Sequence, residues 1–266
     1  DSHLSQIHDP VIADAGQTCQ MRKAIESDEP SLKEALSSSN RDLWEAAIAE
    51  ELESLREAGT WDVVEVPRGA KVFPYRFVLK VKRNSDGTLE RRKARLVLLG
   101  NLQRPFVDFY DTYAPVADFV VVRIVLATAC LKHWVGHQLD VKSAFLNGYI
   151  DEEIYMQLPP EYARADGKVC KLKRSIYGLR QAPRAWNKRL CEDLKGSGFK
   201  ALVNAESVFY GVITGSVVYL IIYVDDILVA SSSETAVLTA KKSLRELYKI
   251  KDLGDAEYFL GVKIER

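Results

Sequence analysis

The feature that most constrains the fold is an acidic pair, Asp225-Asp226, set between two apolar runs. The residues Val-Val-Tyr-Leu-Ile-Ile-Tyr-Val precede the pair and Ile-Leu-Val-Ala follows it, a composition typical of two buried strands. Two adjacent carboxylates in such a hairpin raise each other's pKa, and an unpaired buried charge costs several kcal/mol. Two interpretations stay open: a turn that points both aspartates into water, or a site where divalent cations remove the repulsion.

A third carboxylate, Asp140, ends another strand-like segment, within Gln138-Leu-Asp-Val-Lys-Ser-Ala-Phe145. By itself it is explained as a helix N-cap or a strand-end aspartate. Three carboxylates at the ends of paired strands could instead hold two divalent ions about 3.5–4 Å apart. Spacing along the chain does not show whether Asp140 meets Asp225-Asp226, so their proximity is a prediction about the fold.

The formal net charge is zero, with 37 basic and 37 acidic residues, but the charges are unevenly distributed. Residues 1–60 hold thirteen acidic and five basic side chains. Residues 68–104 hold eleven basic and two acidic ones, and residues 168–200 hold ten and two. Because salt screens charges beyond about 10 Å, two local positive surfaces can bind a phosphate backbone on a neutral molecule.

Hydrophobic periodicity predicts mixed helices and strands without a regular βαβ rhythm, which indicates an α+β fold. Residues 1–30 are mostly polar and are interpreted as a linker or disordered arm. We expect a short helix capped by Ser31 and Glu34, helices over 41–58, 120–131 and 236–249, and mainly helix between 171 and 200 after a Gly-x-x-x-x-Pro turn. We expect strands over 136–141 and 217–230, and hairpins over 77–99 and 256–265.

The hairpin over 77–99 carries most of the first basic cluster. Alternation places Lys80 and Lys82 on one face of the outgoing strand, and Arg91, Lys93 and Arg95 on one face of the returning strand. An edge strand protected from aggregation by lysines and a phosphate-binding surface explain this pattern about equally well.

Other features narrow the class of protein. The four cysteines lie far apart with no CxxC pair, which disfavours a disulfide framework or a zinc knuckle. No apolar run reaches the roughly 18 residues of a membrane span. The chain begins with Asp1 and ends in a strand-like segment, so we expect both ends to be cuts through a longer polypeptide.

Several motifs in order resemble those of copia-type retrotransposon reverse transcriptases over roughly residues 30–266. The tyrosine-x-Asp-Asp box of reverse transcriptases is similar to Tyr223-Val-Asp-Asp226. The other matching segments, in chain order, are Trp44–Trp61, Lys93–Val97, Tyr113–Val116, Leu139–Gly148 with Glu153–Met156, Leu172–Trp186 and Tyr258–Val262.

The resemblance implies a right-hand polymerase with palm and fingers subdomains and with the thumb, connection and RNase H portions absent. It places the fingers at about 59–115 and 148–181 and the palm at about 116–147 and 182–266. It implies an RNA-directed DNA polymerase that extends the 3′-hydroxyl of a primer on an RNA or DNA template with deoxynucleoside triphosphates. The expected partner is the rest of a pol polyprotein, and the expected location is intracellular, in a cytoplasmic particle with a nuclear stage.

The same resemblance assigns roles to individual residues. It makes Asp140, Asp225 and Asp226 the catalytic carboxylates that bind two Mg²⁺ ions, with Mn²⁺ as a substitute and the Val141 carbonyl as a further ligand. It makes Phe145 the residue that excludes a 2′-hydroxyl, although a core aromatic explains that position too. The nucleotide pocket would also include Lys93, Arg95, Tyr177 and Gly178, with Arg95 as our first choice for the triphosphate.

Contacts to template and primer are assigned to residues farther from the aspartates. These residues are Lys80 and Lys82 at the tip of the fingers, Arg180, Arg184 and Lys188 on a helix, and Tyr258, Leu260 and Gly261 in a hairpin. For the three helix cations, a solvent-exposed helix face is almost as good an explanation. Lys249 or Lys251 is a candidate proton donor to pyrophosphate. Two rival functions stay open: a catalytically inactive nucleic-acid-binding remnant, and a two-metal nuclease that uses the same carboxylates.

Overall fold

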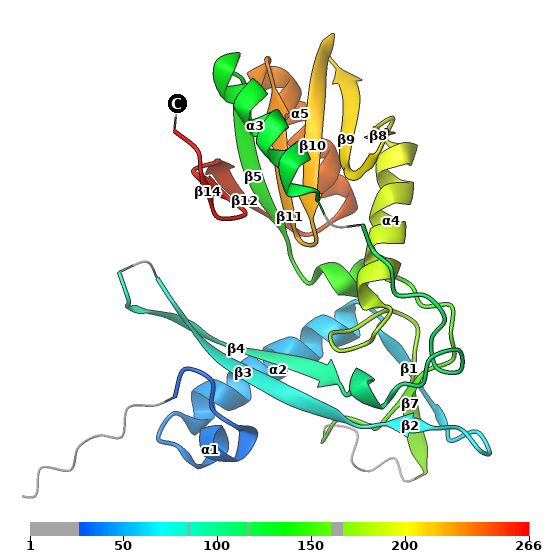
Figure 1. Cartoon of the computed structure of the whole chain (residues 1–266). Helices are drawn as coiled ribbons and strands as arrows, with labels where there is room; N and C mark the ends of the chain where they lie inside the picture. The colour runs from blue at the N-terminus through cyan, green and yellow to red at the C-terminus, as the bar shows by residue number, and fades with distance from the viewer. Residues whose placement is uncertain (1–26, 85, 116, 161–166, 266) are drawn as a thin grey trace, which may run out of the picture.

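The computed structural model describes residues 27–84, 86–115, 117–160 and 167–265. It has two parts, which we call the sheet body and the ribbon body (Figure 1). The sheet body is built on a six-stranded sheet with three helices, and the ribbon body on two smaller sheets and the N-terminal helices. The fold is α+β, as predicted. The expected polar arm over residues 1–30 lies mostly outside the described residues.

The six-stranded sheet is antiparallel throughout and has the order β12-β5-β11-β10-β9-β8. Asp140 lies on β5 and Asp226 lies on β11, and each of these two strands is hydrogen-bonded to a neighbouring strand on both sides. The strands are β5 (Val135–Val141), β8 (Lys200–Leu202), β9 (Ala205–Ile213), β10 (Ser216–Tyr223), β11 (Asp226–Ser231) and β12 (Ile250–Asp255).

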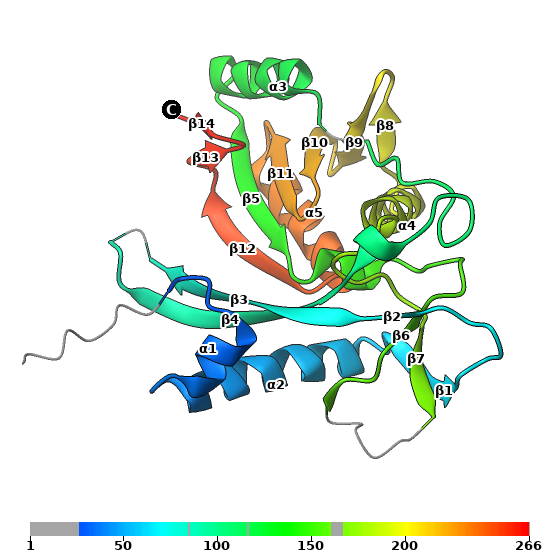
Figure 2. The same ribbon diagram turned by 60° about the horizontal axis from the view of Figure 1, so that its bottom comes forward.

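Helices cover both faces of this sheet (Figure 2). On one face, α4 (Ala182–Gly196) and α5 (Glu234–Leu247) pack against inward residues such as Leu139 and Ile227. On the other face, α3 (Phe119–Leu131) and the hairpin β13–β14 (Tyr258–Phe259, Val262–Lys263) pack against residues such as Ile221 and Leu228. Successive strand residues alternate between the two cores, as the pleat of a β-strand requires.

The ribbon body contains a two-stranded ribbon, β3 (Tyr75–Arg83) with β4 (Leu89–Leu98), that packs on α2 (Arg41–Glu57). The helix predicted over 41–58 is confirmed as α2, and it buries Trp44, Leu52 and Leu55. A four-stranded sheet of order β1-β7-β6-β2 completes the body, formed by β1 (Trp61–Glu65), β2 (Val72–Phe73), β6 (Tyr155–Met156) and β7 (Lys168–Leu172). The short helix α1 (Leu32–Ser37) has the capping box expected from Ser31 and Glu34.

The structure adds several elements that periodicity did not predict. The four-stranded sheet and the strands β8, β9 and β12 were not expected, because their strands are short or alternate only weakly between apolar and polar residues. The region expected to be mainly helical between 171 and 200 begins with the end of β7 and a turn, and α4 starts only at Ala182. Pro183 in the first turn of α4 fits this late start, since proline is tolerated there but not farther along a helix.

Candidate active site

The structure brings Asp140 beside the Asp225-Asp226 pair. In the register of β5 and β11, Asp140 and Asp226 are direct cross-strand partners. On the other side of Asp140, the partner on β12 is Lys251. Cross-strand partners project from the same face of a sheet, so Asp226, Asp140 and Lys251 form a row across three adjacent strands. The spatial prediction about these carboxylates is therefore met.

The turn between β10 and β11 is tight and strained. Tyr223 and Asp226 close it as a pair, which leaves only Val224 and Asp225 at its tip. Val224 has φ +57°, a left-handed conformation that costs a β-branched residue energy. Two hydrogen bonds hold the turn in place: the Val141 N–H donates to the Asp225 carbonyl at 2.8 Å, and Trp186 Nε1 donates to the Val224 carbonyl at 2.7 Å.

Burial and two neighbouring carboxylates disfavour the ionised form of Asp226. Burial raises the pKa of Asp226, and the neighbouring charges of Asp225 and Asp140 raise it further. A hydrogen bond from Gln138 Nε2 to Asp226 Oδ1, at 3.3 Å, acts in the opposite direction. Sequence reasoning missed both Gln138 and Trp186 as supports of this site, although Trp186 ends one of the motifs that carried the resemblance and Gln138 directly precedes another.

The donor chemistry of this cluster fits a hard divalent cation, since it consists of carboxylate oxygens that repel one another. Within the described residues, however, no three acidic, histidine or cysteine side chains are gathered closely enough to form a ready-made metal site. The fit therefore rests on the kind of ligands and on the repulsion felt by Asp226. Asp140, Asp225 and Asp226 are the residues that would hold the ion.

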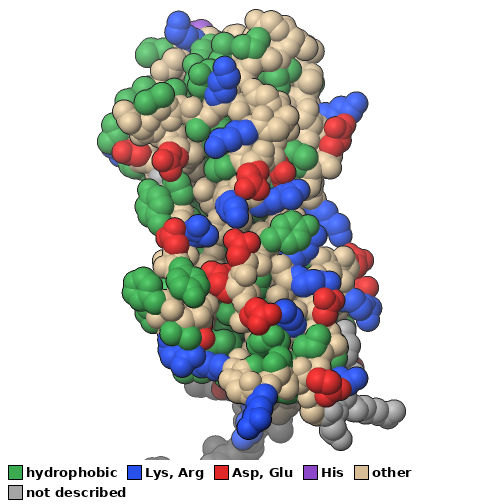
Figure 3. All heavy atoms as spheres, turned by 90° about the vertical axis from the view of Figure 1, so that its right-hand side faces the viewer, with side chains coloured by type: hydrophobic (Ala, Val, Ile, Leu, Met, Phe, Trp, Pro, Cys, Tyr) green, Lys and Arg blue, Asp and Glu red, His purple; other side chains and the backbone are tan. Residues whose placement is uncertain are grey.

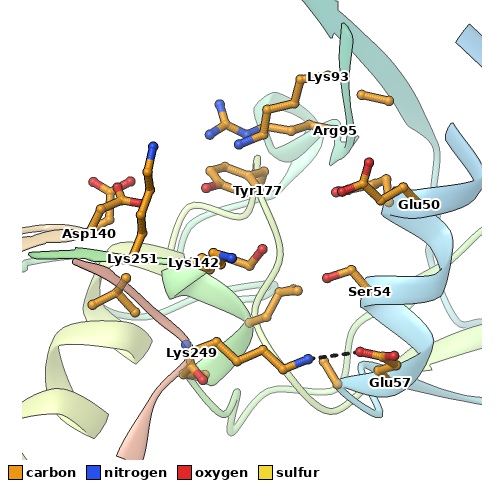
Figure 4. Close-up of a pocket in the computed structure, with 18 of the residues that line it drawn as sticks. Glu50, Ser54, Glu57, Lys93, Arg95, Asp140, Lys142, Tyr177, Lys249 and Lys251 are labelled. Carbon is orange, nitrogen blue, oxygen red and sulfur yellow. Dashed lines mark hydrogen bonds and ion pairs between the residues drawn. The ribbon is translucent and has the colours of Figure 1, made fainter. Parts of the chain in front are cut away.

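A cavity of about 850 Å³ lies between the two bodies and reaches Asp140 and Asp225. Figure 4 shows how its walls are arranged: Asp140 and Lys251 lie on one side, Lys93 and Arg95 lie above Tyr177, and Glu50, Ser54 and Glu57 of α2 face them. Lys249 Nζ reaches across to Glu57 Oε2 at 3.0 Å and so links the two bodies. Acidic residues of α2 were not expected in this region.

The β3–β4 ribbon presents a basic face to this cavity. The register pairs Lys80 with Lys93 and Lys82 with Arg91, and Arg95 follows on the same face of β4. Like charges directly opposite each other are destabilising. Burial lowers the pKa of Lys93, and the charges of Arg95, Arg91 and Lys82 lower it further. Of these cations, Lys82, Arg91, Lys93 and Arg95 line the cavity, whereas Lys80 pairs with Glu29 at 2.5 Å.

Three of the predicted pocket residues, Arg95, Tyr177 and Phe145, are in contact in space, with Tyr177 between the other two. The guanidinium of Arg95 lies 4.4 Å from the ring centroid of Tyr177, and the ring of Phe145 meets Tyr177 edge-on at 5.0 Å. Burial raises the pKa of Tyr177, with the Arg95 charge opposing that shift. Phe145 is partly buried between the two large cores and does not itself line the cavity.

Gly178 is required by packing as well as by backbone conformation. It has φ +93°, and a Cβ added there would lie 2.0 Å from the Leu98 carbonyl oxygen. A Cβ on Gly100 would lie 1.9 Å from the Gly178 carbonyl oxygen. The two glycines thus let the end of β4 cross the turn before α4, next to Tyr177.

The remaining predicted residues lie apart from this cavity. Arg180 donates to the Gly100 carbonyl at 3.2 Å, Arg184 pairs with Asp111 at 2.9 Å, and Lys188 pairs with Asp151 at 3.4 Å. Tyr258, Leu260 and Gly261 belong to the hairpin that follows β12, with Tyr258 exposed and Leu260 packed toward α3.

The loop between β4 and α3 exposes several aromatic side chains, among them Phe106, Tyr110 and Tyr113. This loop runs along the right-hand side of Figure 1, and the space-filling view of that side shows apolar groups interspersed with both basic and acidic ones (Figure 3). Tyr113 begins one of the segments that carried the resemblance, but no role was predicted for any of these aromatics.

With this geometry in place, comparison with known proteins defines the class. The family described as "Reverse transcriptase (RNA-dependent DNA polymerase)" matches residues 58–266. The chain therefore belongs to the reverse transcriptase family, and the predicted relationship to copia-type elements is confirmed by its relatives.

Two plant proteins are among the most similar relatives. The chain is 38% identical over 226 residues to the "Retrovirus-related Pol polyprotein from transposon RE1" of Arabidopsis thaliana, covering 84% of this chain and 15% of that protein. It is 37% identical over 239 residues to the "Retrovirus-related Pol polyprotein from transposon TNT 1-94" of Nicotiana tabacum, covering 89% and 18%. The chain thus spans less than a fifth of the length of either relative.

A yeast relative extends the comparison. The "Transposon Ty1-DR5 Gag-Pol polyprotein" of Saccharomyces cerevisiae is 29% identical over 219 residues, which is 79% of this chain and 12% of that protein.

Within the described part of the chain, no helix is both long and apolar enough to cross a membrane.

Proposed function

We propose that this chain is an RNA-directed DNA polymerase that adds deoxynucleotides to the 3′-hydroxyl of a primer. One observation carries the proposal: Asp140 and Asp226 are direct partners on adjacent strands, and Asp140 and Asp225 line a cavity whose opposite wall carries Lys93 and Arg95. Carboxylates that hold cations, set across from groups that bind phosphate, are what nucleotidyl transfer needs. Membership of the reverse transcriptase family supports the assignment.

In this proposal the sheet body is the palm and the ribbon body is the fingers. Two magnesium ions bound by Asp140, Asp225, Asp226 and the Val141 carbonyl would supply charge neutralisation and activation of the primer hydroxyl. The chain's own residues position the substrates. Lys93 and Arg95 bind the triphosphate, Tyr177 supports the Arg95 guanidinium, and Phe145 limits access to a nucleotide with a 2′-hydroxyl.

Neighbouring elements hold the aspartates in position before substrate binds. Trp186 and Val141 hold the strained Val224–Asp225 tip, so the two aspartates do not have to be ordered when substrate binds. Lys251, next to Asp140, and Lys249 lie where a proton donor to the pyrophosphate would be needed. Template, primer, deoxynucleoside triphosphates and the remainder of a Pol polyprotein are the partners in this proposal.

Addition of a single nucleotide tests the proposal without depending on processivity. The chain is incubated with a labelled primer annealed to RNA, one deoxynucleoside triphosphate and Mg²⁺, and binding to the same duplex is followed in a gel shift. We expect extension by one nucleotide. Binding without extension would favour the inactive remnant, and cleavage of the strand without triphosphate would favour the nuclease.

A further inference from the structure

Glu51 of α2 lies in the matching segment Trp44–Trp61 but was given no role there, and in the structure it forms a polar contact with the ribbon. It follows Ala47 by one helical turn on the side of α2 that packs against the ribbon through Leu79, Val81 and Ala94. Glu51 Oε1 accepts a hydrogen bond from the Leu96 N–H at 3.0 Å. Among the strands that the structure describes, β4 pairs with β3 alone, so this N–H lies on the other edge of β4, and Glu51 satisfies it.

The contact acts directly next to Arg95. The Leu96 N–H belongs to the peptide group that joins Arg95 to Leu96, so the carboxylate fixes the orientation of the backbone from which Arg95 projects. The Nε atom of Arg95 is buried and makes no hydrogen bond to any described residue. The guanidinium lies against the Tyr177 side chain, and this piece of backbone sets the point from which the Arg95 side chain reaches it.

The charge of Glu51 also fits its position. Burial raises the pKa of Glu51, while the charges of Lys93 and Arg95 act to lower it. Conversely, Glu51 favours the charged form of Lys93, against burial and the three neighbouring cations. Glu51 lines the same cavity as Asp140 and Lys93, on the wall formed by α2.

We propose that Glu51 is a positioning residue for a polyphosphate-binding site formed by Lys93 and Arg95. By holding the Arg95–Leu96 peptide group, it keeps both cations directed into the cavity before a ligand arrives. The inference deepens the proposed function, on which it rests for the identity of the polyphosphate as that of a nucleotide. The hydrogen bond, rather than the negative charge, is the part of Glu51 that does this.

Two substitutions separate the effect of the length of the Glu51 side chain from the effect of its charge. Glu51→Gln keeps an acceptor oxygen at the same distance and removes the charge, whereas Glu51→Asp keeps the charge and shortens the side chain by one methylene. Glu45→Asp is the matched control, because Glu45 lies on α2, is exposed, and pairs only with Arg41 of the same helix among the described contacts.

Binding of inorganic tripolyphosphate, measured by calorimetry without divalent ions, is the first readout. Loss of a buried hydrogen bond at this peptide group should weaken binding about tenfold in Glu51→Asp. Glu51→Gln and Glu45→Asp should stay within about twofold of the unchanged chain. The second readout is the KM for the deoxynucleoside triphosphate in single-nucleotide extension, which should rise about tenfold in Glu51→Asp with kcat nearly unchanged.

The outcomes are distinguishable from failure of the polymerase proposal. If the unchanged chain extends no primer but the tripolyphosphate series follows the expected order, the role of Glu51 stands. Equal binding by all variants, equal weakening in Glu51→Gln and Glu51→Asp, or no tripolyphosphate binding by the unchanged chain would overturn it.

Discussion

At the scale of single residues, three carboxyl groups of the folded chain have shifted pKa values, and at each of them burial and hydrogen bonds act in opposite directions. Glu51 and Asp226 both have a raised pKa with burial as the largest cause. Asp252 shows the reverse outcome: burial acts to raise its pKa, but hydrogen bonds from Lys241 and the Gly254 N–H outweigh it and lower the pKa. The charged form is thus disfavoured in the first two and favoured in the third.

The raised pKa of Glu51 predicts how stability depends on pH. Because the folded chain binds the Glu51 proton more tightly than the unfolded chain, this group's contribution to stability falls as pH rises through the interval above its usual pKa. Glu51→Gln removes the unfavourable charge and keeps the acceptor. We expect it to raise the melting temperature at pH 7 by roughly 2–4 °C, about 1 kcal/mol in a chain of this size, with the gain vanishing near pH 4.

Thermal denaturation at several pH values, without divalent ions, measures this effect. Asp252→Asn is the control of opposite sign, because a carboxyl with a lowered pKa stabilises the fold above its usual pKa and loses that contribution as pH falls. A melting temperature for Glu51→Gln below that of the unchanged chain at pH 7 would contradict the assignment.

Phe145 yields a second prediction at this scale. Its ring meets Tyr177 and through it Arg95, so shortening it to alanine should open space beside the position proposed for the nucleotide sugar. We expect Phe145→Ala to reduce discrimination against ribonucleotides at least about tenfold. Competing single-nucleotide extensions measure the ratio of kcat/KM values, with Phe145→Tyr as a control that keeps the ring. Unchanged discrimination in Phe145→Ala would remove Phe145 from the sugar site.

At the scale of elements, the β10–β11 turn depends on a helix far away in the sequence. Val224 adopts a left-handed conformation that its side chain disfavours, and the indole of Trp186 on α4 supplies a hydrogen bond to its carbonyl. Trp186 is buried and also meets Tyr248 edge-on at 5.1 Å. The helix α4 thus holds the acidic turn through this hydrogen bond. Strained backbone such as that of Val224 persists only where the surrounding structure fixes it.

Trp186→Phe should therefore loosen the turn. The substitution keeps an aromatic side chain but removes the N–H, and loss of one hydrogen bond of this kind costs about 0.5–1.5 kcal/mol. We expect a melting temperature lower by several degrees and a single-nucleotide extension rate reduced about tenfold or more. Trp134→Phe is the matched control, since Trp134 stacks on Tyr219 at 5.5 Å, away from the aspartates. Equal extension rates for the two variants would argue against a role for the Trp186 bond.

The elements also show which parts of the fold could be predicted from sequence. Strong periodicity identified α2, α3, α5 and the β3–β4 hairpin, and the capping box at Ser31 identified α1. β12 was missed because its residues, Ile-Lys-Asp-Leu-Gly-Asp, alternate without any fully buried side chain, as expected of an edge strand. Missing β12 meant that the pairing of Lys251 with Asp140 could not be foreseen.

The candidate site was predictable only in its motif residues. The proximity of Asp140 and Asp226 followed from the family resemblance, because no local pattern encodes a pairing between distant strands. The left-handed Val224, the Trp186 bond and the Glu51–Leu96 contact depend on tertiary packing, so they could be found only in the structure. The same holds for Arg184 and Lys188, whose acidic partners come from other segments.

At the scale of the whole molecule, both bodies contribute charged residues to one cavity. The sheet body contributes the aspartates, the ribbon body contributes Lys93 and Arg95, and the Glu57–Lys249 ion pair spans the gap between them. This explains how a chain with a formal net charge of zero can present both a cation-binding and a phosphate-binding surface. The acidic residues of α2 and the basic residues of the β3–β4 ribbon come from separate parts of the sequence, but both line this cavity from the ribbon body.

The central claim is that the facing carboxylates of Asp140 and Asp226 support metal-dependent nucleotide addition. Its most direct measurement is Mg²⁺-dependent addition of one deoxynucleotide by the unchanged chain and by Asp140→Asn, with duplex binding measured in parallel. We predict that Asp140→Asn binds the duplex about as tightly but extends the primer at least about a thousandfold more slowly. Extension by Asp140→Asn at the unchanged rate would contradict the claim.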